Sequence, residues 1–169
     1  MKKPKPLRPQ EGNVVSITLE DGRLALGVLA RVETAHPRKP YGIFVYFLGP
    51  YYNLNGLQTI LQTLSAAASI TWLKTSALDI YRGKWKIVGV VPNWNRVDWP
   101  YPDFYFQDDF TEKLYRRKLS EHDLGTPLNQ SPIAEVGDLR RDEHYGAEAA
   151  RFEVSAQMKN LPAISTLSH

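Results

Sequence analysis

The chain contains no cysteine among its 169 residues, which excludes a disulfide framework, a thiolate nucleophile and a metal held by cysteine. It also contains no apolar run near the roughly 18 residues that a membrane span needs. The first twelve residues, MKKPKPLRPQEG, lack the apolar centre of a secretory signal. A chain without cysteine suits a reducing compartment. We therefore expect a soluble, cytoplasmic protein that does not associate with a membrane.

The motifs of common enzymes are missing as well. The sequence has no HExxH, GxSxG or P-loop pattern and no dinucleotide-binding glycine pattern. Its four histidines do not pair at the spacing of metal ligands; they are His36, His122, His144 and His169. We therefore predict that the chain is not an enzyme and that it binds no metal, no cofactor and no small-molecule substrate.

One group of carboxylates keeps a hydrolase open as a third hypothesis. The stretch 102–112, PDFYFQDDFTE, contains four acidic residues, which are Asp103, Asp108, Asp109 and Glu112. Two carboxylates brought together in a pocket could act as general acid and general base. A solvated acidic face is the more ordinary consequence of such a composition.

Positive charge is concentrated at the N-terminus. The formal net charge is +3, and the isoelectric point is near 9.1. Four cations lie close to the start of the chain: Lys2, Lys3, Lys5 and Arg8. Without them the rest of the chain is close to neutral. We interpret residues 1–10 as a solvated, flexible basic tail rather than as an arm that binds nucleic acid.

The segment 15–33, VSITLEDGRLALGVLARVE, predicts a β-hairpin. Apolar residues alternate with polar ones over 15–19, which is the period of a half-buried strand. Asp21-Gly22 then supplies the turn, because glycine adopts a positive φ without steric cost. Gly27 interrupts the returning strand and predicts a bulge, a bend or the close approach of another backbone.

Further strands follow from apolar and aromatic runs. Residues 41–49, YGIFVYFLG, are typical of a buried central strand. A fourth strand is predicted at 83–94, and short strands at 103–108 and 113–119. Trp85 alternates with an apolar residue in the fourth strand, and we expect it to lie in the core.

Two segments have the periodicity of helices. The first lies around 55–70, with Asn55 as a plausible N-cap and an apolar stripe that should pack across the sheet. The second lies at 144–160. The residues expected on its apolar face are Tyr145, Ala149, Phe152 and Ala156.

The expected fold is α+β: a mostly antiparallel, bent and partly barrel-like β-sheet with one or two helices packed on it. Gly27 and Gly89 are the expected bending points, because a side chain at either position would meet a neighbouring strand. We divide the chain into the basic tail 1–10, a single β-rich domain at 11–125 and a C-terminal extension at 126–169 that carries a helix.

An aromatic, proline-rich loop precedes the fifth strand, and we predict that it binds a protein partner. The five candidate residues are Trp94, Arg96, Trp99, Tyr101 and Asp103. Aromatic rings and arginine dominate binding energy at protein interfaces, and the prolines of the loop limit the freedom lost on binding. Asp98 and Pro100 should hold the backbone of Trp99 extended and project its ring. The alternative is a small core beneath the loop, and the sequence supports both.

A basic cluster, YRRK at 115–118, supports a second function, that of a small β-rich module that binds nucleic acid. An exposed strand with alternating charge is the simpler explanation, so nucleic acid is the disfavoured partner. Salt distinguishes the two functions, because phosphate binding weakens steeply as the salt concentration rises.

Glycines and tryptophans occur at particular positions within and beside the apolar strands between residues 11 and 120. The positions are Gly12, the strand 14–19, Asp21-Gly22-Arg23, Gly27, the strand 44–47, Gly83-x-Trp85, Ile87, Gly89 and the segment 99–104. In this arrangement the chain resembles the immunity protein 26 family. The segments around 55–70 and after 125 depart from the family's pattern, and either could set the choice of partner.

The resemblance implies an immunity protein, or antitoxin, of a bacterial polymorphic-toxin system that serves contact-dependent competition. Such a protein is cytoplasmic and non-catalytic, and it binds and neutralises a cognate secreted toxin domain. The resemblance does not identify that toxin. A near-neutral surface fits a strongly basic nuclease less well than toxins of other chemistry, because opposite charge speeds association.

Overall fold

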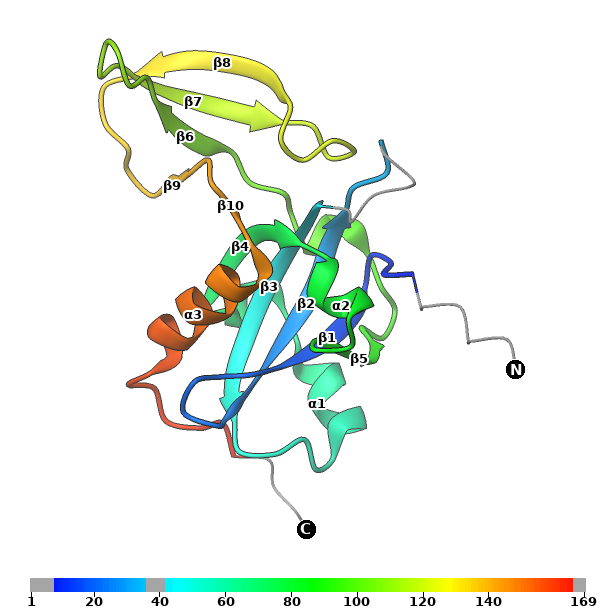
Figure 1. Ribbon diagram of the computed structural model, residues 1–169. Helices are drawn as coiled ribbons and strands as arrows, with labels where there is room; N and C mark the ends of the chain where they lie inside the picture. Colours follow the sequence, from blue (N-terminus) through cyan, green and yellow to red (C-terminus); the bar gives the residue numbers. More distant parts are fainter. Residues whose placement is uncertain (1–7, 36–41, 166–169) are drawn as a thin grey trace.

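The computed structural model describes residues 8–35 and 42–165, so most of the predicted basic tail lies outside the described residues. Figure 1 shows two β-sheets, with helices packed on the larger one. The strands are β1 (Asn13–Thr18), β2 (Leu24–Val32), β3 (Gly42–Tyr51), β4 (Thr71–Ser76), β5 (Lys86–Val90), β6 (Phe104–Gln107), β7 (Leu114–Leu119), β8 (Pro127–Ile133), β9 (Arg140–Arg141) and β10 (His144–Tyr145). The helices are α1 (Leu57–Thr63), α2 (Leu78–Tyr81) and α3 (Ala147–Met158), with 3₁₀ turns η1 (Ala66–Ala68) and η2 (Arg96–Asp98).

The larger sheet has six strands in the order β10-β4-β3-β2-β1-β5, and the smaller sheet has four in the order β8-β7-β6-β9. Strand pairs are antiparallel except at two short strands, β10 beside β4 and β9 beside β6. The predicted α+β class with mostly antiparallel, bent sheets is confirmed. The described strands form two open sheets and not a closed barrel.

The β1–β2 hairpin forms as predicted, with Gly22 at φ +84° in its turn. In the middle of β2, a Cβ atom at Gly27 would lie 2.8 Å from Cγ1 of Val45 and 3.0 Å from Cγ2 of Val15. These two side chains belong to the strands on either side of β2. The expectation that a side chain at Gly27 would meet the neighbouring strands is therefore confirmed, and only a residue without a side chain fits there.

Strands β2 and β3 are buried on both faces, which explains their nearly continuous apolar sequences. One face packs against α2 and α3, with Leu29, Phe47 and Trp85 in its core. The other face packs against α1 and against the loop between β5 and β6, with Phe44 and Tyr46 in its core. The prediction of a buried central strand at 41–49 is confirmed.

Several elements were not expected from the sequence: β4 with α2, and the strands β8, β9 and β10. Strand β4 comes before the strand predicted as the fourth, which is therefore the fifth in the chain. In the larger sheet β4 pairs with β3, whereas β5 pairs with β1 at the opposite edge. None of the described helices is long and apolar enough to cross a membrane.

Helix α1 is shorter than the predicted helix around 55–70 and has seven residues. Its N-cap is Gly56, in the left-handed conformation, and not Asn55. A Cβ atom at Gly89 would lie 2.7 Å from Cδ1 of Leu61 on this helix. The expectation that Gly89 makes room for a neighbouring strand is therefore wrong, since the glycine makes room for α1.

Helix α3 lies within the predicted segment but turns another face to the sheet. Its buried apolar residues are Ala150, Val154 and Met158, whereas Phe152 of the predicted face is exposed. Tyr145, which began the predicted stripe, belongs to β10 and precedes the helix. Counting the helical period from that residue therefore placed the apolar face on the wrong side.

Strands β6, β7 and β8 form a three-stranded unit, here called the arm (residues 104–133), which projects from the larger sheet (Figure 1). A partly buried ion cluster holds it. The carboxylate of Asp142 accepts a hydrogen bond from Nζ of Lys74 on β4 and one from Arg117 on β7, the latter at 3.1 Å. Burial lowers the pKa of the Lys74 amine, and the neighbouring Asp142 opposes this shift. An unpaired charge here would be costly, so the cluster ties the arm to β4.

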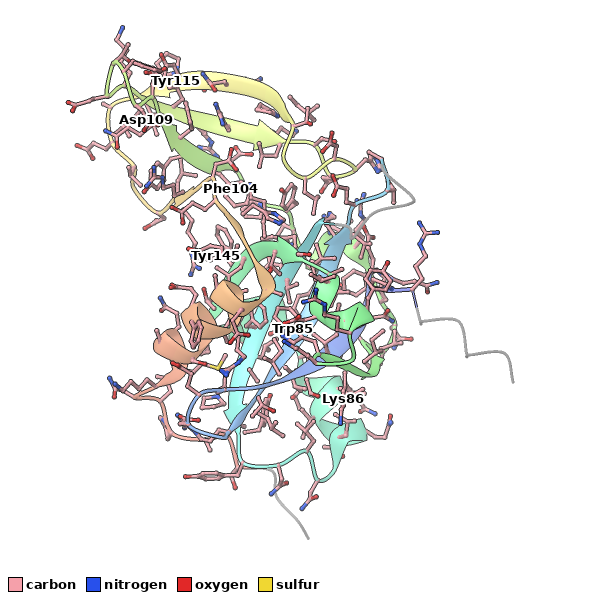
Figure 2. The ribbon with its side chains drawn as sticks, in the orientation of Figure 1. Trp85, Lys86, Phe104, Asp109, Tyr115 and Tyr145 are labelled. Atoms are coloured by element: carbon pink, nitrogen blue, oxygen red, sulfur yellow. The ribbon has the colours of Figure 1, made fainter. Side chains whose placement is uncertain are left out.

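The predicted core position of Trp85 is confirmed (Figure 2): the side chain is 2% exposed and its ring meets Phe47 edge-on, with centroids 6.1 Å apart. We expect Trp85→Ala to lower the free energy of unfolding by about 3–5 kcal/mol, because it leaves a cavity. Urea denaturation followed by circular dichroism measures the change.

Trp85→Phe is the matched control. The indole N–H of Trp85 is buried and has no hydrogen-bond partner in the part of the chain that the structure describes. The phenyl ring keeps most of the packing and removes an unsatisfied donor, so this variant should lose much less stability than the alanine variant. An unchanged denaturation midpoint for Trp85→Ala would contradict the core assignment.

Candidate protein-binding site

The loop 91–103 joins β5 to β6 and covers one face of the larger sheet. The side chain of Trp99 is 3% exposed, and its ring meets Tyr46 of β3 edge-on at 5.4 Å. The Tyr46 hydroxyl donates to the carbonyl of Pro100 at 2.6 Å. The expectation that Trp99 projects its ring into solvent is therefore wrong. The ring packs on the apolar face of β3 and shields that face from water.

Tyr101 is also turned inwards. Its ring centroid lies 4.9 Å from that of Phe44 on β3, and its hydroxyl donates to the carbonyl of Leu124 at 2.9 Å. Burial raises the pKa of the Tyr101 phenol, so the hydroxyl stays protonated at physiological pH and keeps this hydrogen bond. The bond ties the loop to the segment that follows β7.

Trp94 of the loop is partly buried against the backbone just before β1. It stacks on Trp99 with centroids 6.1 Å apart and an interplanar angle of 25°. A Cβ atom at Gly12 would lie 2.9 Å from Cδ2 and Cγ of the Trp94 side chain, and Gly12 also has φ +86°. The indole therefore fits against backbone that only glycine leaves open.

The outward side of the loop is the short turn η2. The side-chain oxygen of Asn95 accepts a hydrogen bond from the N–H of Val97 at 3.2 Å and so caps the turn. Val97 is 81% exposed, and the neighbouring Arg96 side chain is 37% exposed. The turn therefore presents an apolar side chain and a guanidinium group side by side on a hydrogen-bonded backbone.

A chain of four charges with alternating sign fixes Arg96. The guanidinium of Arg31 on β2 is buried, donates to Glu121 at 2.9 Å and donates to the carbonyl of Trp99 at 3.0 Å. A second oxygen of Glu121 lies 3.5 Å from Arg96, which also binds Glu11 at 3.1 Å. Arg96 is thus held between two carboxylates and oriented before any partner binds.

A cavity of about 700 Å³ opens between this loop and the arm, and we call it the loop–arm groove. Its lining includes Arg96, Val97, Tyr101, Lys118, Glu121 and Leu128. Leu128, at the start of β8, is 65% exposed. The groove therefore has exposed apolar side chains on both walls, with cationic groups beside them, which is a composition suited to a protein partner.

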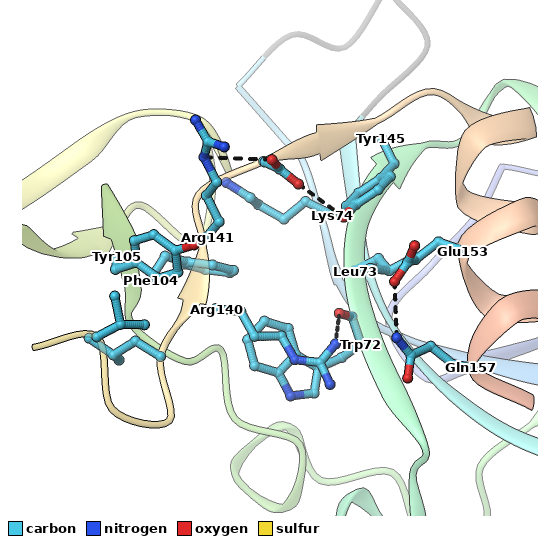
Figure 3. A pocket seen from close by; sticks show the side chains of 13 residues that line it. Trp72, Leu73, Lys74, Phe104, Tyr105, Arg140, Arg141, Tyr145, Glu153 and Gln157 are labelled. Carbon is cyan, nitrogen blue, oxygen red and sulfur yellow. Dashed lines mark hydrogen bonds and ion pairs between the residues drawn. The ribbon is translucent and has the colours of Figure 1, made fainter. Parts of the chain in front are cut away.

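A second cavity, of about 480 Å³, lies between β4, the base of the arm and α3 (Figure 3). Internal partners hold its cations. Arg140 lies over the ring of Trp72, 4.5 Å from the centroid, and donates to the Trp72 carbonyl at 3.2 Å. Arg141 lies 3.6 Å from Glu143, and Lys74 belongs to the ion cluster described above. The contacts of Arg140 and Lys74 join β9 and the base of the arm to β4, so we assign this cavity to the attachment of the smaller sheet.

The structure gives two of the four predicted acids roles within the fold. Asp103 accepts a hydrogen bond from Arg116 at 2.7 Å. Asp108 accepts two backbone N–H bonds, from Phe110 and Thr111, each at 2.9 Å. Among residues 8–35 and 42–165, no group of three histidine, aspartate or glutamate side chains could hold a metal ion.

The basic cluster 115–118 lies on β7. Arg116 binds Asp103, and Arg117 binds Asp142 while its guanidinium carbon lies 3.6 Å from the centroid of the Phe106 ring. Lys118 lines the loop–arm groove. Two of the three cations are therefore engaged by carboxylates of the chain itself, which leaves less charge for phosphate groups.

The fold and the groove define a small α+β domain whose exposed concave surface suits a protein. The model of the family described as Immunity protein 26 matches residues 10–114. The chain therefore belongs to the immunity protein 26 family, as the resemblance indicated, and its general role is that of an immunity protein. Comparison with curated proteins finds no match, and neither does comparison with solved structures.

Sequence reasoning missed several residues of the groove, among them Arg31, Glu121 and Leu128. Arg31 carried a usable signal, because it is the one charge in the apolar strand LALGVLARV. Its burial requires a carboxylate partner. Leu128 stands alone in a polar segment and gives no periodic signal.

We expect Trp99→Ala to lower the free energy of unfolding by about 3–5 kcal/mol, because it removes a buried ring from the face of the larger sheet. Val97→Ala in the same loop is the matched control and should change stability by less than about 0.5 kcal/mol, since Val97 is exposed. Thermal denaturation of both variants checks this. Equal stability of the two would contradict the division of the loop into a buried and an exposed side.

Proposed function

We propose that the chain binds the toxin domain of a cognate secreted protein and neutralises it by covering the toxin's active surface. The observation that carries this proposal is the loop–arm groove, with exposed Val97 and Leu128 on opposite walls and an oriented Arg96 beside Val97. Membership of an immunity protein family supports a toxin as the partner.

The groove is suited to tight binding because its walls are held in place before a partner arrives. Carboxylates on two sides orient Arg96, and buried rings fix the loop that carries Val97. A surface ordered in advance loses less side-chain and loop freedom on binding. Arginine beside apolar contacts is also the composition found where interfaces concentrate their binding energy.

The two walls of the groove differ in their relation to the family. The loop wall lies within the matched residues 10–114, whereas Lys118 and Leu128 of the arm wall lie beyond them. We infer that the loop wall serves the function common to the family and that the arm wall, with Lys118 and Leu128, selects the individual toxin.

Neutralisation by occlusion requires no catalysis, no cofactor and no small-molecule substrate. The chain would act in the cytoplasm of the bacterium that makes it, as part of a contact-dependent, polymorphic-toxin system. Its lack of cysteine is compatible with that compartment.

The genes immediately upstream of this chain's gene are first searched for a large secreted protein. The C-terminal domain of that protein, purified in a catalytically inactive form, then serves as the toxin in the test. We expect Arg96→Ala and Val97→Asp each to raise Kd by about 30-fold or more, which corresponds to about 2 kcal/mol. Their melting temperatures should stay close to that of the wild type, because both side chains lie at the surface. Tyr52→Ala, exposed and outside the groove, is the control and should bind normally.

Two outcomes would contradict the proposal. If the unmodified chain neither binds nor inhibits the active toxin domain, the proposed function fails. If both groove variants bind as tightly as the wild type, the groove is not the contact surface. The nucleic-acid alternative is tested with single-stranded RNA. Tight binding that falls steeply as salt rises would support it against the toxin partner.

A further inference from the structure

The tip of the arm, defined here as residues 107–113 between β6 and β7, presents a phenylalanine to solvent. Phe110 is 98% exposed, more than any other large apolar side chain that the structure describes. Figure 2 labels its neighbour Asp109 on the arm, far from Trp85, which precedes β5 of the larger sheet. A ring in this position adds nothing to the core of the chain.

The turn that carries Phe110 is ordered by hydrogen bonds. Besides the two N–H groups that the Asp108 carboxylate accepts, the N–H of Glu112 donates to the Asp108 carbonyl at 2.8 Å. The side-chain amide of Gln107 donates to the Glu112 carbonyl at 3.3 Å. The backbone bonds from Thr111 and Phe110 lower the pKa of Asp108, so this cap stays ionised at neutral pH. The ring therefore stands on a preorganised turn and loses little chain freedom on binding.

Acidic residues flank Phe110 in the sequence of the tip. Asp108, Asp109 and Glu112 lie within the tip, and Lys113 is its only cation. The tip is thus locally acidic although the chain as a whole is not. An apolar ring with an acidic rim complements a pocket that has an apolar floor and a rim of lysine or arginine.

The tip and the loop–arm groove lie at opposite ends of β7, since Lys118 and Leu128 line the groove and the tip precedes Leu114. Along β7, Lys113 of the tip and Lys118 of the groove are five positions apart, which is about 17 Å of strand. That span lies within an interface of standard size, roughly 800 Å² on each partner. One toxin domain can therefore contact both.

We propose that Phe110 inserts into an apolar, cation-rimmed pocket on the toxin and that Asp109 and Glu112 steer the tip towards it. This inference rests on the proposed function and adds a second contact outside the groove. The tip acts as an anchor, and the acidic rim selects toxins whose pocket is basic.

The first test measures binding of the inactive toxin domain to Phe110→Ala. Loss of the ring should raise Kd by about 30-fold or more, mainly through faster dissociation. The melting temperature should not change, because the side chain has no part in the core. Phe110→Leu keeps apolar bulk and should recover part of the affinity. Tyr52→Ala, which removes another exposed ring, is the control and should bind like the wild type.

The second test removes charge without removing shape, with the double variant Asp109→Asn and Glu112→Gln. Its association rate should fall by about tenfold at low salt, and the difference from the wild type should disappear near 0.5 M salt, where charges beyond a few ångströms are screened. Its dissociation rate should change little, because these acids steer the approach while Phe110 holds the complex.

The outcomes separate this inference from the function on which it rests. If the wild type does not bind the toxin domain, both fail. If the wild type binds and the groove variants weaken it while Phe110→Ala binds normally, the tip is not a contact and the inference alone is overturned. A second copy of the chain could instead bind the ring, and sedimentation of the free chain tests this. A wild-type dimer that Phe110→Ala dissociates would assign the ring to that second copy and would overturn the inference.

Discussion

The ring of Phe104 lies where the two sheets meet, and the position of the arm depends on it. This ring packs edge-on against Trp72 of β4 and against Tyr101 of the loop, with centroids 5.5 and 5.6 Å away. The ammonium group of Lys74 lies 4.6 Å from the ring centroid. Phe104 is also the first residue of β6, so the chain leaves this aromatic cluster to begin the arm. One wall of the groove and the turn at Asp108 therefore take their positions from the same packing.

Local patterns predicted the elements whose burial is decided by their own sequence, such as the hairpin of β1 and β2 and the apolar strand β3. Strand β4 was not predicted because its sequence, TWLKTS, has a lysine near its centre. Lys74 is tolerated there through Asp142, which lies 68 positions away, and no local pattern reveals such a partner. Strand β8, PLNQSPI, has two prolines and no apolar alternation. It forms at the open edge of the smaller sheet, where proline is tolerated.

The aromatic loop was located correctly as an unusual segment, but its composition could not show which side faces the sheet. On that face Trp99 packs against Tyr46 of β3, and Tyr101 packs against Phe44. What remains outside is the turn with Arg96 and Val97. Phe110 gave no sequence signal, because a lone phenylalanine beside a strand is expected to be buried. Only the projection of the arm shows that it is not.

The central claim is that the loop–arm groove and the tip of the arm together hold the toxin domain. Hydrogen exchange, measured by mass spectrometry on the free chain and on its complex with the toxin domain, tests this most directly. We expect slower exchange in the complex for peptides that cover residues 95–98, 107–113 and 118–128, with no change in α1 or α3. Slower exchange confined to α1 or to the open edge at β5, with the arm unaffected, would contradict it.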